Sequence, residues 1–513
     1  MQLSIQSWIK SAIMAKRAFL QASARFSSAT VVAWPGSRCG RLMRGICLMT
    51  LLAIVSPSVV AQDTARGAAI ERLERLAKKG NARAQSQLGS IYYGGKNGVQ
   101  KDYSLAVYWF TKAAEQGYLN AVFNLALCHE RGRGVPKNTA EALRLYRRAA
   151  DEGLLQAQIN AAVILLEMDD DAAANKYLHL GAAKGNFYCQ REYARNLLQG
   201  RGTEKDFDRA IALLDAAADG GDAEAKLLLA DCYSGMYPSI PRDTQQMVDY
   251  LWSAASDGVP EAQSKMGYCY EKGIGVAADQ ETAFKWYGQA AEKNYPQAMV
   301  NLGHCYQAGV GTAKDEKKAF EWYKKAAEMD FAVGLFNLGI FYMTGGPVAR
   351  NERIAFSYFE RAAKLGFVQA QYNLAVAYEE GKGADINRPM AFFWYKQAAR
   401  QEYPAAITGL GYCYYRGFGI KQDHDRAKEL FIQAKDLNND EARFALRSLK
   451  WGPLDAEERA VLPPVTRRAR AEDLPALPFK SPSRGPIATK DTVKPKPQVI
   501  QGAGGFLQPV RAD

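Results

Sequence analysis

The apolar residues of one 36-residue stretch, 262–297, fall into two helical stripes. In its first half, Ala262, Met266, Cys269 and Tyr270 follow one another at the three- and four-residue spacings of an amphipathic helix. The second half, ETAFKWYGQAAEK, carries a similar apolar face made of Ala283, Trp286, Tyr287, Ala290 and Ala291. The pattern therefore predicts two short helices, each with one buried face.

The residues between and after these helices are typical of turns and helix caps. Gly273 and Gly275 can adopt the positive φ angles of a tight reversal, and Asp279 is a suitable N-cap for the second helix. Asn294 stands where a left-handed C-cap residue is expected. In other copies the same place holds Gly117, Gly153, Gly258 and Gly366.

This two-helix unit recurs about every 36 residues, ten times between residues 84 and 449. We align the copies on one residue of the first helix, the anchor, and number the following residues as offsets from it. The predicted anchors are Ala84, Ala121, Ala157, Tyr193, Ala225, Ala262, Ala298, Gly334, Ala370 and Ala406, with Ala442 opening a partial eleventh unit. On this alignment the fourth unit is shortened to 32 residues. Such a period predicts an all-α solenoid, a fold used more for binding than for catalysis.

The unit resembles the Sel-one-like repeat, a relative of the tetratricopeptide repeat. The segment from Ala298 through Leu302-Gly303 to Ala326-Ala327-Glu328 is a nearly complete copy of that pattern, and matching units cover about 370 of the 513 residues. The resemblance implies a right-handed α/α superhelix of about ten helix-loop-helix repeats. It also implies a scaffold or adaptor for protein complexes, in bacteria often an exported one that serves polysaccharide secretion, envelope signalling or host contact.

Three units depart from the pattern in the loop between their helices. The third reads EMDDDA at 167–172, the fifth reads YPSIP at 237–241, and the eighth reads GGP at 345–347. Irregular loops of a solenoid are candidate contact sites, and sequence drift is the alternative.

The two ends of the chain differ in composition from the repeats. Residues 1–61 contain seven basic and no acidic residues, an apolar run at 45–55, and a small-residue site ending at Ala61. We predict a signal peptide cleaved after Ala61, with Met43 as a possible start, and a mitochondrial transit peptide as the alternative. Residues 62–83 should form an N-terminal capping helix, 84–451 the solenoid, and 452–513 a proline-rich disordered tail.

The net charge of +12 is concentrated outside the repeats. The leader contributes +7 and the tail +3, so that the predicted solenoid carries only +2. This balance argues against nucleic acid as a partner. The apolar run of the leader is too short to cross a bilayer, so we expect no integral membrane span in the mature chain.

The sequence predicts no enzyme, cofactor or metal site. Five cysteines share offset 7, where other units have Ile, Phe or Ala, so we expect buried free thiols. The four histidines match no metal or catalytic motif, and neither a P-loop nor a nucleophile elbow is found. Catalytic residues drawn from distant repeats stay an open alternative. The five cysteines are Cys128, Cys232, Cys269, Cys305 and Cys413.

Two repeated positions are candidate partner-binding residues. Asparagines at offset 3 should form ladders along one margin of the first helices, where they could hold a peptide or bond between repeats. Aromatic residues at offset 2 should face solvent and offer a contact surface. The asparagines are Asn124, Asn160, Asn196, Asn301, Asn337 and Asn373, and the aromatics are Phe123, Phe336 and Tyr372.

Together these observations predict a periplasmic or secreted repeat scaffold that binds protein partners, plausibly in an envelope, polysaccharide-secretion or signalling assembly. A mitochondrial location is the alternative to export. The alternative function is a protein that binds or hydrolyses glycan or peptidoglycan fragments, which would require carboxylates clustered on one surface.

Overall fold

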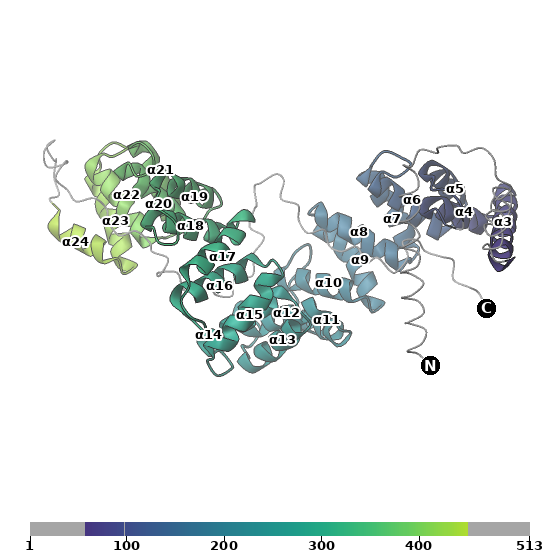
Figure 1. The fold of residues 1–513 in the computed structure, drawn as a ribbon, viewed down its shortest axis with the longest axis horizontal. Coiled ribbons are helices and arrows are strands. Elements are labelled where there is room, and N and C mark those ends of the chain that lie inside the picture. The colour runs from purple at the N-terminus through teal and green to yellow at the C-terminus, as the bar shows by residue number, and fades with distance from the viewer. Residues whose placement is uncertain (1–56, 97, 450–513) are drawn as a thin grey trace, which may run out of the picture. The chain divides into compact units, whose positions relative to one another are not determined.

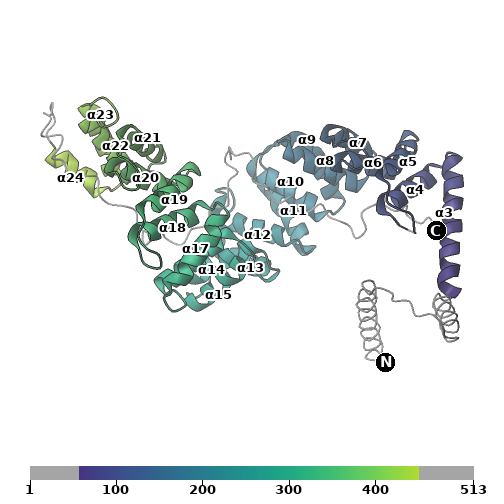
Figure 2. The ribbon, with the colours of Figure 1, turned by 45° about the horizontal axis from the view of Figure 1, so that its top comes forward.

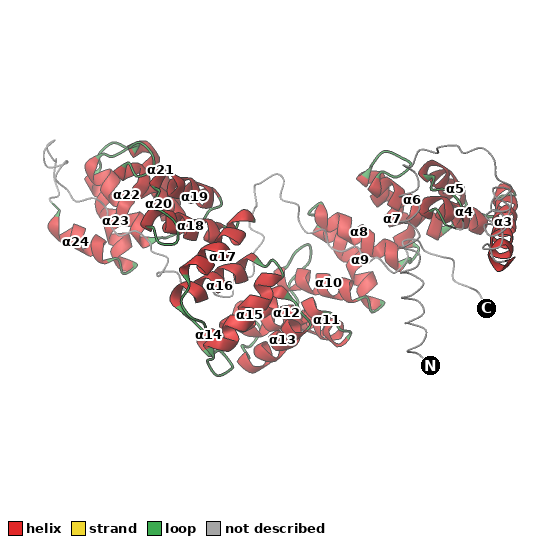
Figure 3. Ribbon diagram, viewed as in Figure 1, coloured by secondary structure: helices red, strands yellow, loops and turns green. Residues whose placement is uncertain are grey.

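The computed structural model describes residues 57–96 and 98–449, and side chains from residue 68 onward. Within these ranges the chain forms α-helices and one short π-helical turn, with no strand (Figure 3). The predicted leader and tail lie outside the described residues and stay predictions. The predicted cleavage point after Ala61 falls inside the first described helix, α3 (Pro57–Lys78).

Ten helix pairs follow α3 in chain order, which agrees with the predicted all-α solenoid. The first helices are α4 (Ala82–Gly94), α6 (Leu119–Arg131), α8 (Leu155–Glu167), α10 (Phe187–Gln199), α12 (Ala223–Asp231), α14 (Pro260–Lys272), α16 (Pro296–Ala308), α18 (Ala332–Thr344), α20 (Val368–Glu380) and α22 (Pro404–Arg416). The second helices are α5 (Tyr103–Glu115), α7 (Thr139–Asp151), α9 (Asp171–Ala183), α11 (Phe207–Asp219), α13 (Thr244–Ser256), α15 (Gln280–Glu292), α17 (Glu316–Glu328), α19 (Glu352–Lys364), α21 (Arg388–Ala399) and α23 (His424–Asp436). A final helix, α24 (Asp440–Ser448), begins the partial eleventh unit, and η1 (Cys232–Met236) extends α12.

The described residues divide into two compact units, one of 57–121 with 133–135 and one of 122–132 with 136–449. In the first unit α3 packs on α4, where Ala77, Ala84 and Leu88 are buried together. In the second unit each helix from α7 to α24 packs on the next helix in the chain, as Figures 1 and 2 show for α14 to α23.

The helix lengths follow from the predicted caps. The Asp279 carboxylate accepts hydrogen bonds from the backbone N–H groups of Glu281 and Thr282 and so begins α15. Asn294 has a φ of 60°, which confirms the left-handed residue after that helix. Because the same caps recur, most of the helices from α4 to α24 are 13 residues long.

A glycine on the first helix makes room for an aromatic ring on the second. A Cβ added to Gly267 would lie 2.7 Å from the ring of Tyr287, which is fully buried. Gly303 faces Tyr323 in the same way, 2.6 Å from an added Cβ. The two helices of a unit therefore approach closely at this glycine, and the aromatic ring is a core residue.

The buried tyrosine of each such pair has a hydrogen-bond acceptor 16 residues earlier in the same unit. Tyr287 donates to Glu271 at 2.9 Å, and Tyr323 donates to Gln307 at 2.8 Å. Tyr146 and Tyr395 donate to Glu130 and Glu379 in the same way. Where the ring is phenylalanine, as in Phe359 and Phe431, the residue 16 positions earlier is Met343 or Tyr415. In the first unit, which is one residue longer, Tyr93 stands 17 positions before Phe110.

The structure corrects the alignment of the fourth unit. Every other anchor is the third residue of its first helix, and in α10 that residue is Cys189, not Tyr193. The short unit is therefore the third, whose helices α8 and α9 are joined by only three residues, 168–170. Losing four loop residues shortens the repeat without changing either helix.

Candidate functional site

The aromatic residues predicted to face solvent are buried. Phe336 and Tyr372 have no exposed surface, and Phe123 is 8% exposed. The prediction that offset 2 forms a solvent-facing contact surface is wrong. Replacing these rings by alanine would create cavities and so test folding rather than binding.

Neighbouring aromatic rings cover these residues. The ring centre of Phe336 lies 5.7 Å from that of Phe359, in the second helix of the same unit. It lies 5.2 Å from the ring centre of Phe367, just before the first helix of the next unit. Tyr372 packs on Tyr395 and Tyr403 in the same way. A single first helix would leave the side chain at offset 2 exposed to solvent. The residue just before the next first helix covers that side chain.

The predicted asparagine ladders also lie inside the packing. Asn124, Asn301, Asn337 and Asn373 are at most 4% exposed, so they do not present amides on the surface. Both amide atoms of Asn124 and of Asn373 are buried without a hydrogen-bond partner among the described residues. Asn160 is half-buried and bonds to the Tyr146 hydroxyl.

Asn196 belongs to a different position. With Cys189 as the anchor, Asn196 moves from offset 3 to offset 7, the position that holds cysteine in five other units. It is buried, and its amide donates to Asn175 at 2.7 Å, while Asn175 donates to the backbone carbonyl of Arg201 at 2.8 Å. This pair joins the second helix of the third unit to the first helix and the loop of the fourth unit.

The six cysteines of the described residues are buried free thiols, as predicted. Burial raises the pKa of Cys269 and of Cys305 to about 12, which makes them poor nucleophiles. Among the described residues no group of His, Cys, Asp and Glu has the arrangement of a metal site.

In regular units the glycine loop of one repeat lies against the start of the preceding second helix. A Cβ added to Gly311 would overlap the backbone carbonyl of Gln280, the first residue of α15, and one at Gly419 would overlap that of Arg388 in α21. We call this place at the start of a second helix the loop slot. Gly134, Gly202, Gly275 and Gly383 occupy the equivalent slots of α5, α9, α13 and α19.

The fifth unit leaves the loop slot of α11 without a glycine. Its loop passes through η1 and returns over itself, so that a Cβ added to Gly235 would meet only Arg242 of the same loop, at 3.6 Å. The side chain of Ile240 is buried, and the backbone N–H of Asp243 donates a hydrogen bond to the carbonyl of Tyr233. These two contacts hold the loop in this path. No glycine from this loop replaces the missing contact.

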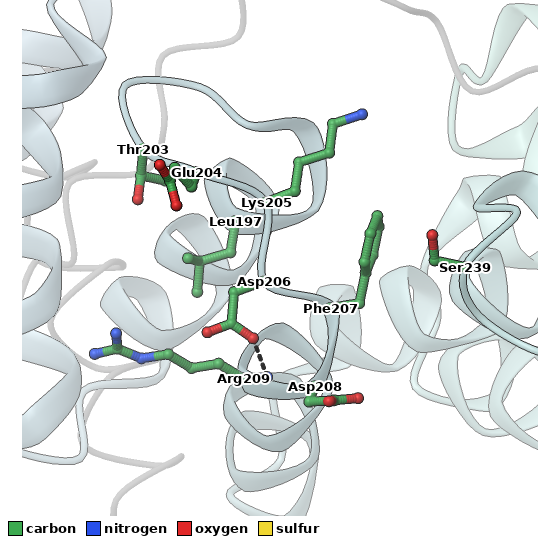
Figure 4. A pocket seen from close by; sticks show the side chains of 9 residues that line it. All are labelled: Leu197, Thr203, Glu204, Lys205, Asp206, Phe207, Asp208, Arg209 and Ser239. Carbon is green, nitrogen blue, oxygen red and sulfur yellow. Dashed lines mark hydrogen bonds between the residues drawn. The ribbon is translucent and has the colours of Figure 1, made fainter.

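A hollow of about 510 Å³ lies at this slot (Figure 4). The start of α11 and the loop before it form most of its wall, and Ser239 reaches it from the loop of the fifth unit (Figure 4). Its polar side chains carry both signs of charge, which suits an uncharged or mixed-charge segment. The lining residues are Leu197, Thr203, Glu204, Lys205, Asp206, Phe207, Asp208, Arg209 and Ser239.

Contacts with neighbouring helices hold the wall of the hollow in place. Asp206 caps α11 by accepting from the backbone N–H of Arg209 at 3.0 Å. The guanidinium of Arg209 lies 3.1 Å from His179 Nδ1 and 5.1 Å from the ring centre of Tyr193. The hollow is therefore preformed, so that binding there costs little ordering.

The first helices α10, α12 and α14, with the N-cap of α12, carry partly buried ion pairs that sequence reasoning missed. Arg191, only 12% exposed, lies 2.6 Å from Asp222 and 3.2 Å from Glu192. Lys265 lies 2.6 Å from Asp231 and 2.9 Å from Glu261. Burial lowers the pKa of Lys265, but the two carboxylates outweigh it and the pKa is raised, so the ammonium stays charged.

The irregular loop at 237–241 was the sequence signal for this region, but no motif pointed to the individual residues. Lys205, Arg209 and Ser239 come from two different units, and only the fold brings them to one hollow. The regular helix pairs and the filled loop slots define a class, the all-α solenoid built from helical-hairpin repeats.

The chain belongs to the Sel1 repeat family. The family's repeat matches residues 82–118, 119–154, 188–222, 260–295, 296–331, 332–367, 368–403 and 404–439, which is more than half of the sequence. The third and fifth units, the ones without a glycine loop, are absent from these matches. Sel1 repeats generally mediate interactions between proteins.

Several known proteins share this architecture. A protective antigen of uropathogenic Escherichia coli with an SLR fold aligns with a TM-score of 0.50 and 30% identity, covering 74% of this chain and 89% of that one. DAP3-binding cell death enhancer 1 of Mus musculus is 35% identical over 198 residues, 39% of this chain and 32% of that protein. Chitin synthase regulator SKT5 of Saccharomyces cerevisiae is 34% identical over 84 residues, 16% of this chain and 12% of that protein. The chain therefore spans about a third or less of the length of these two relatives.

Across the part of the chain that the structure describes, helices are too short or too polar to pass through a lipid bilayer.

Proposed function

We propose that this protein is an exported scaffold that acts by binding protein partners, without catalytic activity of its own. The hollow at α11 carries this proposal, because it offers a preformed polar surface on a solenoid in which glycines fill six other loop slots. Membership of the Sel1 repeat family supports protein partners, and the basic, then apolar, leader supports export.

The proposed setting is the periplasm or the outside of the cell, in an envelope, polysaccharide-secretion or signalling assembly. In such an assembly the solenoid would hold a partner by equilibrium binding, with affinity coming from a few contacts at the irregular units. The two relatives with functional names are described as a regulator and a binding protein, which fits a role without chemistry.

Site-specific photo-crosslinking in living cells tests the proposal. A photoreactive amino acid replaces Lys205, which lines the hollow, or Lys101, which stands at the same place before α5. Both residues are exposed and both precede the N-cap of a second helix, but the loop slot of α5 is filled by Gly134. We expect discrete protein adducts at position 205 that are weak or missing at position 101.

Equal adducts at both positions, or none at either, would contradict the proposal. In the second case a screen of the purified protein against glycan fragments examines the alternative function. Cell fractionation and N-terminal sequencing of the tagged protein test export and cleavage after Ala61, and an intact leader in the cytoplasm would contradict them.

A further inference from the structure

We propose that the hollow at α11 receives a glycine-containing turn of the protein partner, in the place that a neighbouring repeat's loop fills elsewhere. This inference rests on the proposed scaffold function and names the chemistry of its partner. The solenoid itself supplies the template, since six other loop slots show what fits at the start of a second helix.

In the filled slots the fit depends on the absence of a side chain. Gly134, Gly311, Gly383 and Gly419 each lie so close to the first backbone carbonyl of the preceding second helix that an added Cβ would overlap it. All four have φ between 67° and 81°, where glycine is favoured. The slot therefore selects a glycine in a left-handed turn.

Side chains around the glycines add a second contact. Arg133, between the two glycines of its loop, stacks on Tyr103, the first residue of α5, at 5.5 Å. Phe418 contacts the guanidinium of Arg388, the first residue of α21, at 4.1 Å. In the filled slots, a side chain of the turn thus meets the first side chain of the helix.

At the start of α11 the contact between side chains is present, but no glycine backbone lies against the first carbonyl of the helix. Tyr237 of the fifth unit lies 6.1 Å from the ring of Phe207, the first residue of α11. No glycine follows Tyr237 in its loop, and the hollow stands where the turn would pass. An incoming turn thus needs its glycine backbone more than any particular side chain.

The charges around the hollow further describe the turn. Lys205 and Arg209 offer donors, while Glu204 and Asp208 offer acceptors, so that neither a strongly basic nor a strongly acidic segment is favoured. A short, polar, glycine-containing turn on the surface of a folded partner meets these conditions. Such a turn costs little entropy to dock because it is already formed.

Filling the slot from within the chain tests the inference. In the graft variant, residues 235–242 are replaced by 272–278, the glycine loop of the sixth unit. In the control graft, residues 309–314 of the seventh unit are replaced by 273–278, so that a filled slot receives another filled loop of equal length. Ser239→Trp fills the hollow from an exposed position and serves if the graft fails to fold, with Lys314→Trp as its control.

The readout is the yield of the adduct formed by the photoreactive residue at position 205 in the full chain, with thermal unfolding checked for each variant. We expect the graft and Ser239→Trp to lower the yield at least tenfold, and both controls to leave it unchanged. Mass spectrometry should place the crosslink beside a glycine in the partner. Replacing that glycine by valine should lower the yield to a similar extent.

Full capture by a folded graft variant would overturn the inference and leave the scaffold proposal standing. Adducts that map to residues 450–513 of the same chain would overturn it in favour of an internal occupant, and a crosslinked partner segment without glycine would overturn it as well. If the unaltered chain captures no protein at any tested position, the scaffold proposal itself fails.

Discussion

The regular repeats at 260–439 and the central repeats at 155–259 fill the same interhelical space with different residues. In the regular part, a glycine on the first helix faces a large ring such as Tyr287. In the central part, the equivalent residues are alanine and leucine, as in Ala194 with Leu214 and Ala230 with Leu251, and all four are buried. The helix pair tolerates either combination because the summed volume changes little.

The two regions also differ in their polar residues. In the regular part, three units place a neutral asparagine at offset 3, and three units link a tyrosine hydroxyl to an acceptor inside the same unit. The central part and its border carry partly buried ion pairs between units, such as Arg191 with Asp222 and Lys265 with Asp231. The ion pairs of the central part and its border thus join one unit to the next, as Arg416 with Glu379 does near the end of the regular part.

The largest expected effect breaks an ion pair at the border of the central part. Lys265→Met removes the buried ammonium group that pairs with Asp231 and Glu261, which should cost about 3–5 kcal/mol of unfolding free energy. Asn373→Ala at the same offset of a regular unit should change it by less than about 1 kcal/mol, because that amide has no partner to lose. Urea unfolding of both variants measures the difference. Equal losses would show that the two regions do not differ at offset 3.

The next effect concerns a filled loop slot. Gly311→Ala combines an unfavourable backbone conformation with overlap of the Gln280 carbonyl and should cost about 1–3 kcal/mol. Gly235→Ala in the fifth unit carries the backbone penalty alone, since the nearest atoms lie 3.6 Å away. Gly311→Ala should therefore have a lower unfolding temperature than Gly235→Ala. The reverse order would contradict the slot as a close backbone contact.

A smaller effect tests the tyrosine bonds of the regular part. Tyr323→Phe removes the donor to Gln307 and should cost about 1–2 kcal/mol. Adding Gln307→Met should recover most of this loss, because it recreates the Phe359 and Met343 combination of the eighth unit. A double-mutant cycle followed by urea unfolding measures the coupling between the two sites. Additive losses would mean that the hydroxyl and the amide do not depend on each other.

The smallest effect is a pH dependence at the end of the regular part. Burial raises the pKa of Glu379, and burial together with the charge of Glu379 raises the pKa of Glu441. A carboxyl group whose pKa is higher in the folded chain stabilises the fold fully at a pH below its ordinary pKa near 4.5. This contribution is lost as the pH rises through the pKa of the folded state.

Helices α20 to α24 should therefore exchange their amide hydrogens more slowly at pH 5 than at pH 8, after correction for intrinsic rates. Glu441→Gln should weaken this dependence, whereas Glu429→Gln, at an exposed site, should leave it unchanged. If amide exchange in the unaltered chain were slower at pH 8 than at pH 5 after this correction, the predicted direction of the pH effect would be wrong.

The helices, caps and core residues could be predicted because they depend on local patterns. Asp279 and Asn294 act within one unit, so the repeat period revealed their roles. The alignment error at the fourth unit has a physical cause. A four-residue gap can be placed in either of two adjacent units when one of them, as here, lacks the glycine loop.

The candidate site could not be predicted to the same degree because it depends on neighbouring units. Phe336 is buried by Phe367, and the hollow at α11 exists because of the path of a loop in the following unit. A helical wheel describes one helix surrounded by solvent. In a solenoid each first helix is also covered by the next unit, and only the fold shows how.

The separation of 16 residues along the sequence between a buried tyrosine and its acceptor has a consequence for how such a chain can gain repeats. Both members of the pair belong to the same repeat, so a duplication of 36 residues copies donor and acceptor together. Each new copy arrives with its buried hydroxyl already satisfied. Recombination between repeats can therefore lengthen or shorten the array without leaving a buried tyrosine hydroxyl unmatched.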